Sequence, residues 1–122
     1  MTVTALDHVN IQTADLAATV GFYTEVIGLA EGARPNITRP GAWLYCGERP
    51  VIHVIAVGEG DETGTGPIDH VAFEAAGYEA MAEQLKRRGF AYRTQELPDM
   101  GIRQIFVHDP NGVKLELNFR GA

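Results

Sequence analysis

Three histidines and one glutamate recur at matching distances along the chain. His8 and His70 each follow an aspartate and precede a valine, and they are 62 residues apart. His53 and Glu116 lie in apolar runs and are 63 residues apart. The matching offsets indicate one unit written twice, with imidazole and carboxylate groups at related places. Such groups bind divalent transition metals and transfer protons, so the first interpretation is chemistry at a metal.

In a folded duplication these four side chains are expected to converge near a pseudo-twofold axis and hold one metal ion. The predicted ligands are His8, His53, His70 and Glu116. The set suits Zn, Fe(II), Ni, Co or Mn, because imidazole and carboxylate groups bind all of these. It does not suit Ca or Mg, which prefer oxygen ligands. Glu116 and His53 are also the candidate catalytic residues, each able to act as ligand or as base.

Strand periodicity gives these side chains an orientation. His8 is out of phase with the apolar residues of its own run, and the same holds for His70 and Glu116. Because alternate side chains of a strand point to opposite faces, all three are predicted to face away from the helices. His53 lies in a run that is apolar on both faces, so only its alignment with Glu116 turns it inward. A core histidine is the alternative.

The elements around these residues repeat in the same order. Each copy reads as a strand, a helix that stops at a glycine (Gly28, then Gly89) and three further strands. The predicted class is α+β, with two tandem βαβββ modules forming a curved, mainly antiparallel sheet, or cup, and helices on its outer face. Module 1 spans 5–57, an acidic glycine-rich linker spans 58–66, and module 2 spans 67–120 of a single domain, 1–122. Strands are expected at 6–12, 42–46, 51–57, 68–74, 90–94, 102–108 and 113–119, with residues 30–41 mostly loop around one short strand.

A further set of residues borders the predicted cup and could contact a substrate. The aromatic candidates Trp43 and Tyr45 are in phase with each other, although core packing would explain them equally well. Arginines in the same region could hold an anionic group, with solvated surface charge as the alternative. The substrate-binding candidates are Trp43, Tyr45, Arg39, Arg103, Phe106 and His108, and Arg34 is a further cation near the cup.

Composition excludes several classes of function. The net charge of −6 and pI near 5.1 argue against a nucleic-acid partner, which requires a basic face. No apolar run approaches the roughly 20 residues of a membrane span. Serine is absent, which excludes a serine nucleophile. The start of the chain lacks the features of a signal peptide, so a cytoplasmic location is expected. The single Cys46 is expected to be a buried thiol in a strand.

Four segments together resemble a known superfamily. They are residues 7–9 (DHV), 22–29 (FYTEVIGL), 69–73 (DHVAF) and 109–117 (DPNGVKLEL). This pattern is similar to that of the vicinal oxygen chelate superfamily. The superfamily includes glyoxalase I, methylmalonyl-CoA epimerase, fosfomycin resistance enzymes, extradiol dioxygenases and the metal-free bleomycin resistance proteins. The resemblance covers nearly the whole chain.

The resemblance implies roles for individual residues. It makes His8, His70 and Glu116 the three ligands common to the metal-dependent members. His53 falls where glyoxalase I has a glutamate ligand and the epimerase a glutamine, so histidine there departs from both patterns. His53 could ligate the metal or act as a base beside it.

Three functions follow as expectations. The first is a divalent-metal-dependent enzyme of the glyoxalase type, a lyase or isomerase acting through an enediolate-like intermediate on a small substrate that chelates the metal through adjacent oxygens. The second is an extradiol-type Fe(II) dioxygenase that cleaves a catechol. The third is a metal-free small-molecule-binding or drug-resistance protein. Metal content separates the third from the other two.

The working form is predicted to be a homodimer, because one βαβββ module makes only half of a cup. The resemblance adds that modules can be exchanged, with His8 and His53 from one subunit and His70 and Glu116 from the other. If sites are shared, inactive His8→Ala and Glu116→Ala chains that are unfolded and refolded together should regain part of the activity. Mixed dimers without recovery would place each site within one chain, and a monomer by light scattering would reject the dimer.

Overall fold

Hydrogen bonding between strands organises the chain into two units. The computed structural model describes residues 6–58, 68 and 70–121. The chain divides into unit 1, residues 1–62, and unit 2, residues 63–122. Most of the predicted linker, 58–66, lies outside the described residues. Each unit is considered by itself.

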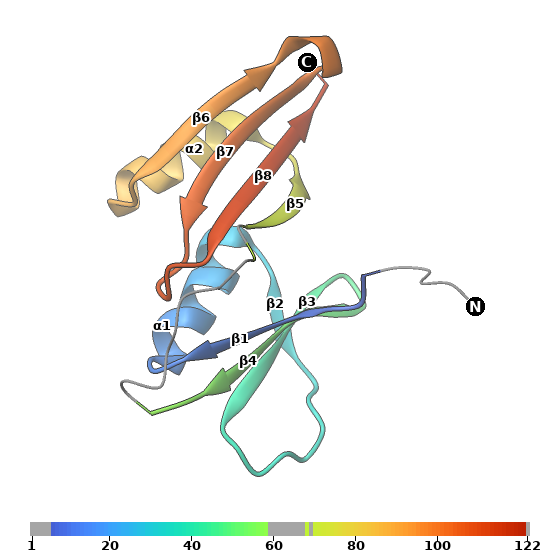
Figure 1. Ribbon diagram of the computed structural model, residues 1–122, viewed down its shortest axis with the longest axis vertical. Helices are drawn as coiled ribbons and strands as arrows, with labels where there is room; N and C mark the ends of the chain where they lie inside the picture. Colours follow the sequence, from blue (N-terminus) through green and yellow to red (C-terminus); the bar gives the residue numbers. More distant parts are fainter. Residues whose placement is uncertain (1–5, 59–67, 69, 122) are drawn as a thin grey trace, which may run out of the picture. The chain divides into compact units, whose positions relative to one another are not determined.

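Unit 1 contains one four-stranded sheet and one helical segment (Figure 1). Its elements are β1 (Val9–Thr13), α1 (Leu16–Gly21), the π-helical segment η1 (Phe22–Ile27), β2 (Ala30–Gly32), β3 (Gly41–Cys46) and β4 (Arg49–Ala56). The strand order is β1-β4-β3-β2. β1 runs parallel to β4, and the other two pairings are antiparallel.

Unit 2 repeats this arrangement. Its elements are β5 (Val71–Ala75), α2 (Tyr78–Arg88), β6 (Tyr92–Leu97), the short 3₁₀ segment η2 (Pro98–Met100), β7 (Ile102–His108) and β8 (Lys114–Arg120). The order is β5-β8-β7-β6, with β5 parallel to β8. The predicted α+β class with two βαβββ modules is confirmed. The described strands form two open mixed sheets, one in each unit.

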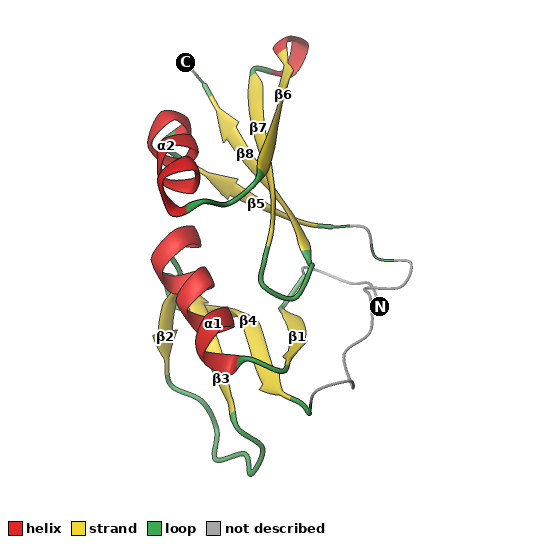
Figure 2. Cartoon of the chain, turned by 90° about the vertical axis from the view of Figure 1, so that its left-hand side faces the viewer, coloured by secondary structure: helices red, strands yellow, loops and turns green. Residues whose placement is uncertain are grey.

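A helix covers one face of each sheet, and that face holds the core (Figure 2). In unit 1 the hydroxyl of Thr19 on α1 donates to that of Thr13 on β1 over 2.9 Å. In unit 2 the rings of Tyr78 on α2 and Phe119 on β8 meet edge to face with centroids 5.4 Å apart. The most deeply buried strand residues alternate along this face: Leu44, Ile52 and Val54 in unit 1, and Ile105, Val107, Leu115 and Leu117 in unit 2. The opposite face of each sheet is here called the site face.

Local hydrogen bonds set the ends of the helical segments. Asp15 caps α1, because its side chain accepts from the amide of Ala18 over 3.0 Å. The segment ends at Gly28, whose φ of 96° is left-handed, and α2 ends in the same way at Gly89 with φ 82°. Both predicted helix stops are therefore confirmed. The conformation favours glycine because a Cβ there is strained.

Some predicted boundaries and environments differ from the structure. β1 begins at Val9, so His8 immediately precedes the strand rather than lying within it. β6 continues to Leu97, beyond the predicted end at 94, because its residues pair along β7 as far as Ile102. Cys46 is exposed, and the expectation of a buried thiol was wrong: it is the last residue of β3, next to the turn at Gly47. No helix in the described ranges is long and apolar enough to cross a membrane.

Thr13 is predicted to contribute more to stability than its size suggests. Its fully buried hydroxyl oxygen accepts from the Asp15 amide over 2.9 Å and from the Thr19 hydroxyl. Thr13→Val keeps the shape but leaves both donors without this acceptor, which should lower the free energy of unfolding by about 1–3 kcal/mol. Thr19→Val should cost less, since the Thr13 oxygen retains the Asp15 amide. Urea denaturation measures the free energy of unfolding of both variants. Equal losses of stability in Thr13→Val and Thr19→Val would contradict the prediction.

Candidate metal centre

Three rings are stacked on the site face of unit 1. The register places His53 on β4 between Asn10 on β1 and Trp43 on β3. The His53 ring lies flat against Trp43, with centroids 4.0 Å apart and planes 11° apart. On its other side it lies flat against His8, with centroids 3.8 Å apart and planes 10° apart. The imidazole of His53 is therefore held between two rings and does not enter the core.

The surroundings of His53 favour its neutral form. Burial beneath the two rings lowers the pKa of His53, and the nearby charge of His8 lowers it further. Its Nε2 lies 3.1 Å from the carbonyl oxygen of Pro50. A carbonyl only accepts, so Nε2 carries the proton, and in the neutral ring the lone pair is on Nδ1. His53 can therefore act as a base or ligand through Nδ1.

His8 has one ring nitrogen engaged and one available. Its Nδ1 lies 2.7 Å from a carboxylate oxygen of Asp7. The hydrogen bond from His8 lowers the pKa of the Asp7 carboxyl, so the acceptor is ionised. A carboxylate that accepts from one ring nitrogen fixes the tautomer and leaves the other nitrogen as a metal ligand. Nε2 of His8 is thus the atom free to ligate.

Unit 2 brings His70 and Glu116 together. His70 Nε2 lies 3.4 Å from Glu116 Oε1. The other carboxylate oxygen, Oε2, accepts from the amide of Asn118 over 2.9 Å. Asn118 in turn accepts from the amide of Gln104 over 2.9 Å. This chain across β7 and β8 fixes one oxygen of Glu116 and leaves the other directed at His70.

The donors fit a transition metal to different degrees in the two units. Ligands at about 2.0–2.2 Å from a tetrahedral ion lie roughly 3.4 Å apart, which matches the pair His70 and Glu116. The stacked rings of His8 and His53 do not fit in the same way. An imidazole ligates in its own plane, and two nearly parallel planes do not meet at one ion. His8 must turn out of the stack if both rings are to ligate.

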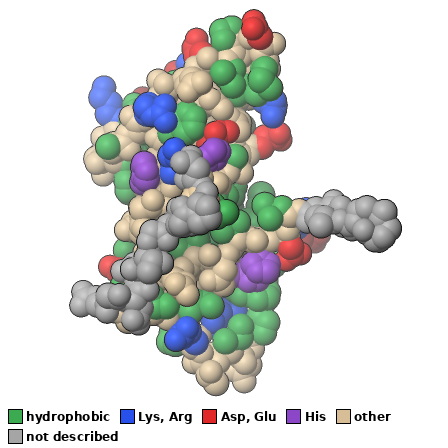
Figure 3. Space-filling model, viewed as in Figure 1, with side chains coloured by type: hydrophobic (Ala, Val, Ile, Leu, Met, Phe, Trp, Pro, Cys, Tyr) green, Lys and Arg blue, Asp and Glu red, His purple; other side chains and the backbone are tan. Residues whose placement is uncertain are grey.

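The predicted four-residue set is brought together as two pairs, one in each unit. Within residues 6–58, 68 and 70–121, no three His, Cys, Asp or Glu side chains gather as a metal-binding group. Histidine side chains reach the surface of each unit (Figure 3). The units match residue by residue on the site face. The cross-strand row Asn10, His53, Trp43, Gly32 corresponds to the row Ala72, Glu116, Phe106, Arg93.

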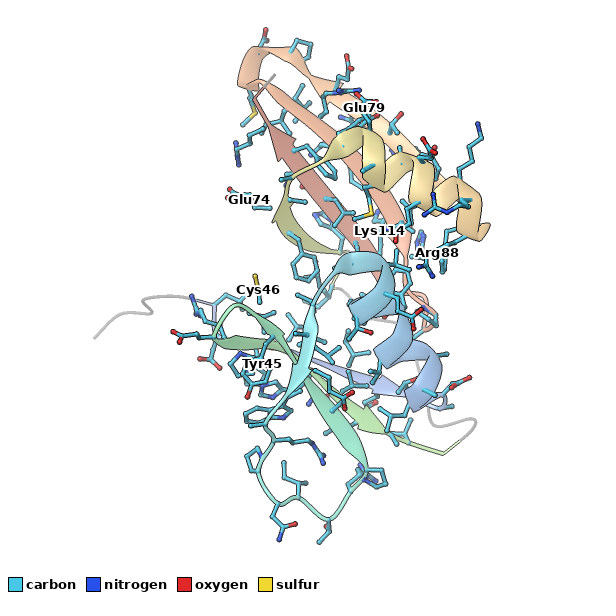
Figure 4. The ribbon with its side chains drawn as sticks, turned by 180° about the vertical axis from the view of Figure 1, so that it is seen from behind. Tyr45, Cys46, Glu74, Glu79, Arg88 and Lys114 are labelled. Carbon is cyan, nitrogen blue, oxygen red and sulfur yellow. The ribbon has the colours of Figure 1, made fainter. Side chains whose placement is uncertain are left out.

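Several predicted substrate-binding residues lie on or beside the site faces. Phe106 is directly opposite Glu116 in the β7–β8 pairing. His108 is exposed at the end of β7, opposite Lys114. Tyr45 lies towards the end of β3, beside Cys46 (Figure 4), and its hydroxyl donates to the carbonyl of Ala33 over 2.6 Å. Arg39 is exposed, and its main-chain oxygen accepts from Arg34 over 2.8 Å.

Arg103 is not brought to the site face. Its guanidinium lies 3.6 Å from the centre of the Tyr78 ring and 3.0 Å from a carboxylate oxygen of Glu79. Glu79 is on α2, where Figure 4 labels it. The hydrogen bond that Arg103 donates to Glu79 raises the pKa of Arg103 further. Arg103 shares the phase of Ile105 and Val107, which face the helix. It joins α2 to β7, and we correct its assignment as a substrate contact.

Residues that the sequence analysis did not select also lie on the site face of unit 2. Gln104 and Asn118 support Glu116 through hydrogen bonds. Strand alternation in the sequence could have placed both on this face, because Gln104 is in phase with Phe106 and Asn118 is in phase with Glu116. Arg93 lies 4.4 Å from the centre of the Phe106 ring. Its position opposite Phe106 depends on the β6–β7 register, which sequence periodicity did not provide.

The His53 environment makes a titration measurable without metal. In metal-free protein His53 is predicted to titrate below the ordinary histidine value of 6.5, because burial and His8 disfavour its charged form. His8→Ala removes a covering ring and a neighbouring charge, and should raise the His53 pKa. His108→Ala, on unit 2, serves as the control and should leave it unchanged. The pKa is measured by NMR titration of the His53 ring resonances. A His53 pKa at or above 6.5 in wild type would contradict the prediction.

Comparisons with known proteins identify the family and the fold. The family model for the Glyoxalase/Bleomycin resistance protein/Dioxygenase superfamily matches residues 5–117. Glutathione transferase FosA of Serratia marcescens is 31% identical over 93% of this chain and 79% of its own length. A glyoxylase/bleomycin resistance protein/dioxygenase domain from Frankia sp. EAN1pec has a similar structure, with a TM-score of 0.78 and 24% identity over 98% of this chain and all of the other.

The fosfomycin resistance protein FosX from Listeria monocytogenes shares the fold as well. Its TM-score is 0.75, with 17% identity over 98% of this chain and 96% of its own. The chain therefore belongs to the Glyoxalase/Bleomycin resistance protein/Dioxygenase superfamily, the vicinal oxygen chelate group.

Proposed function

We propose that the protein is a divalent-metal-dependent enzyme acting on a small substrate that offers the metal adjacent oxygens. The observation that carries the proposal is the pair His70 and Glu116, whose donor atoms are 3.4 Å apart. The hydrogen bond from Asn118 to the second carboxylate oxygen supports it, because such a bond orients a ligand. His8, with Nε2 available, completes a three-ligand set, and Zn, Fe(II), Ni, Co or Mn would suit these donors.

The chain's own residues have separable roles in this proposal. A bound metal would supply Lewis-acid stabilisation of negative charge on substrate oxygen. His53 is neutral, has its lone pair on Nδ1 and lies beside His8, so it is the candidate base. Glu116 is the alternative base. Trp43 covers the second face of His53 and restricts the access of water to it.

The leading reaction class is that of the glyoxalases, a lyase or isomerase reaction in which a proton moves next to a substrate oxygen. A second candidate is transfer of the glutathione thiol to a small substrate. The specific observation in its favour is the 31% identity to the protein named glutathione transferase FosA. The two classes differ in product: the first forms a glutathione thioester, which can be hydrolysed, and the second forms a stable glutathione thioether.

A homodimer with shared sites remains part of the proposal. His8 and His53 belong to unit 1, whereas His70 and Glu116 belong to unit 2. A complete ligand set therefore needs both units, from one chain or from two. Exchange between two copies of the chain would supply the same set as pairing within a chain.

About one divalent transition metal should bind per ligand set. Elemental analysis and calorimetry after loading with Zn, Ni, Fe(II) or Mn measure it. His8→Ala and Glu116→Ala should each lose most of the metal, because each removes a ligand. Asn118→Leu should weaken binding about 10–100-fold, because it removes the support of Glu116 without removing a ligand. His108→Ala is the control and should keep the metal. Less than about a tenth of a metal per wild-type chain would contradict the proposal.

The reaction class is tested on the same loaded protein. Hemithioacetals of 2-oxoaldehydes, epoxides with glutathione, and catechols with oxygen are supplied in turn. Isomerisation of the hemithioacetal to a 2-hydroxyacyl thioester, which hydrolysis returns to free glutathione, supports the glyoxalase class. A glutathione thioether formed from the epoxide, which resists that hydrolysis, supports the second candidate, and oxygen uptake on catechols would overturn both. In the productive assay His53→Ala should lose most of the turnover while retaining its fold by circular dichroism.

A further inference from the structure

A guanidinium group occupies the site face of unit 1 above a glycine. Nη2 of Arg34 donates to the main-chain oxygen of Arg39 over 2.8 Å. A Cβ built at Gly41 would lie 2.2 Å from the main-chain oxygen of Val54, 2.8 Å from this nitrogen and 3.2 Å from Cζ of the same side chain. Gly41 is in phase with Trp43 on β3. The guanidinium therefore packs against Gly41, where a side chain would collide with both the Val54 carbonyl and Arg34.

The loop that carries Arg34 is attached to the sheet close to this place. The Tyr45 hydroxyl holds the carbonyl of Ala33 over 2.6 Å. The Tyr45 ring also lies against Gly32, where an added Cβ would approach it to 2.9 Å. Together with the bond from Arg34 to Arg39, these contacts fix both sides of the loop. Arg34 is thus held in position before any ligand arrives.

None of the described residues neutralises the positive charge of Arg34. Among the ion pairs of the described residues, none involves Arg34, whose single hydrogen bond goes to a neutral carbonyl. Its Nε is buried and has no acceptor. A buried donor without a partner costs free energy, so this arrangement does not serve folding stability. The Nε of Arg103 is also buried without a hydrogen-bond acceptor, but the charge of Arg103 has Glu79 and Glu96 as ion-pair partners.

Arg34 also acts on the candidate base. Its charge contributes to lowering the pKa of His53, after the larger effects of burial and of His8. His53 and Trp43 are directly opposite each other in the β3–β4 pairing, and Gly41 is two residues from Trp43. A ligand that reaches His53 on this face is therefore within the influence of the guanidinium.

We infer that Arg34 recognises an anionic group, a carboxylate, phosphate or phosphonate, on the substrate of this site. A guanidinium binds such oxyanions through paired, charge-assisted hydrogen bonds. The chain as a whole has a net charge of −6 and repels anions. The guanidinium of Arg34 would provide the local positive charge that an anionic substrate needs to bind. The inference rests on the proposed function for the location of the chemistry, and it assigns the substrate a negative charge apart from its chelating oxygens.

The first test needs no metal and uses inorganic phosphate as the probe. Phosphate is titrated into metal-free protein while the Nε–H resonance of Arg34, and in every protein the main-chain amide resonances of the loop that carries position 34, are followed by NMR. A saturable shift is expected in wild type, and binding should be lost in Arg34→Ala and in Arg34→Gln. The glutamine variant keeps a donor for the Arg39 carbonyl and guards against a folding defect. No shift in wild type, or phosphate binding in both variants as strong as in wild type, would overturn the inference.

Two further variants separate position from total charge. Arg39→Ala removes a charge from the same loop but keeps the main-chain acceptor, and it should bind phosphate nearly as wild type does. Arg87→Ala removes an exposed charge from α2 in unit 2 and should have no effect. If Arg39→Ala abolishes binding while Arg34→Ala does not, the assignment of Arg34 is wrong.

The second test links the anion to the metal and distinguishes the two proposals. Acetohydroxamate chelates metals through two adjacent oxygens, and succinic monohydroxamate adds a carboxylate to the same group. The carboxylate should improve binding to metal-loaded wild type about tenfold and should give no gain in Arg34→Ala. Arg34→Ala should still bind metal and acetohydroxamate. Failure of wild type to bind metal refutes the proposed function, whereas equal gains in both proteins refute the role of Arg34.

Discussion

The orientation of the candidate site depends on the burial of aliphatic side chains in the last strand of each module. Ile52 and Val54 are almost fully buried against the helix side of unit 1, and Leu115 and Leu117 are buried in the same way in unit 2. Side chains alternate along a strand, so the residue between each pair must face the other way. Those residues are His53 and Glu116. A slip of one residue in either strand would bury an imidazole or a carboxylate and expose two aliphatic groups.

The two copies use the same frame for different chemistry. In unit 1 the residue at this position is held by flat contact with Trp43 and His8. In unit 2 it is held by a chain of carboxamide hydrogen bonds from Asn118 and Gln104. Burial between stacked rings favours the neutral form of an imidazole, whereas the hydrogen bond from Asn118 fixes the orientation of the carboxylate. The duplication therefore produces a pair of unlike groups.

Much of this arrangement could be predicted from the sequence, because it depends on local periodicity. The face of Glu116 follows from its alternation with leucines, and the βαβββ order follows from the glycine stops and the strand patterns. The same rule, applied to Arg103, places it with Ile105 and Val107 on the helix side, so that error was avoidable. The pairing of Asn118 with Gln104 could not be predicted from alternation within one strand. It depends on how β7 and β8 align across the turn that joins them.

Features that depend on loops or on rotamers were beyond sequence reasoning. Arg34 is in a segment without periodicity, and its place above Gly41 is determined by a backbone carbonyl and by the absence of a side chain on β3. The stack of His8 on His53 is a choice of rotamer by a residue that precedes its strand. It has a chemical consequence, because the same imidazole cannot lie flat on His53 and share an ion with it. Metal binding through His8 and His53 together would uncover one face of His53, and this would reduce the burial that keeps the base neutral.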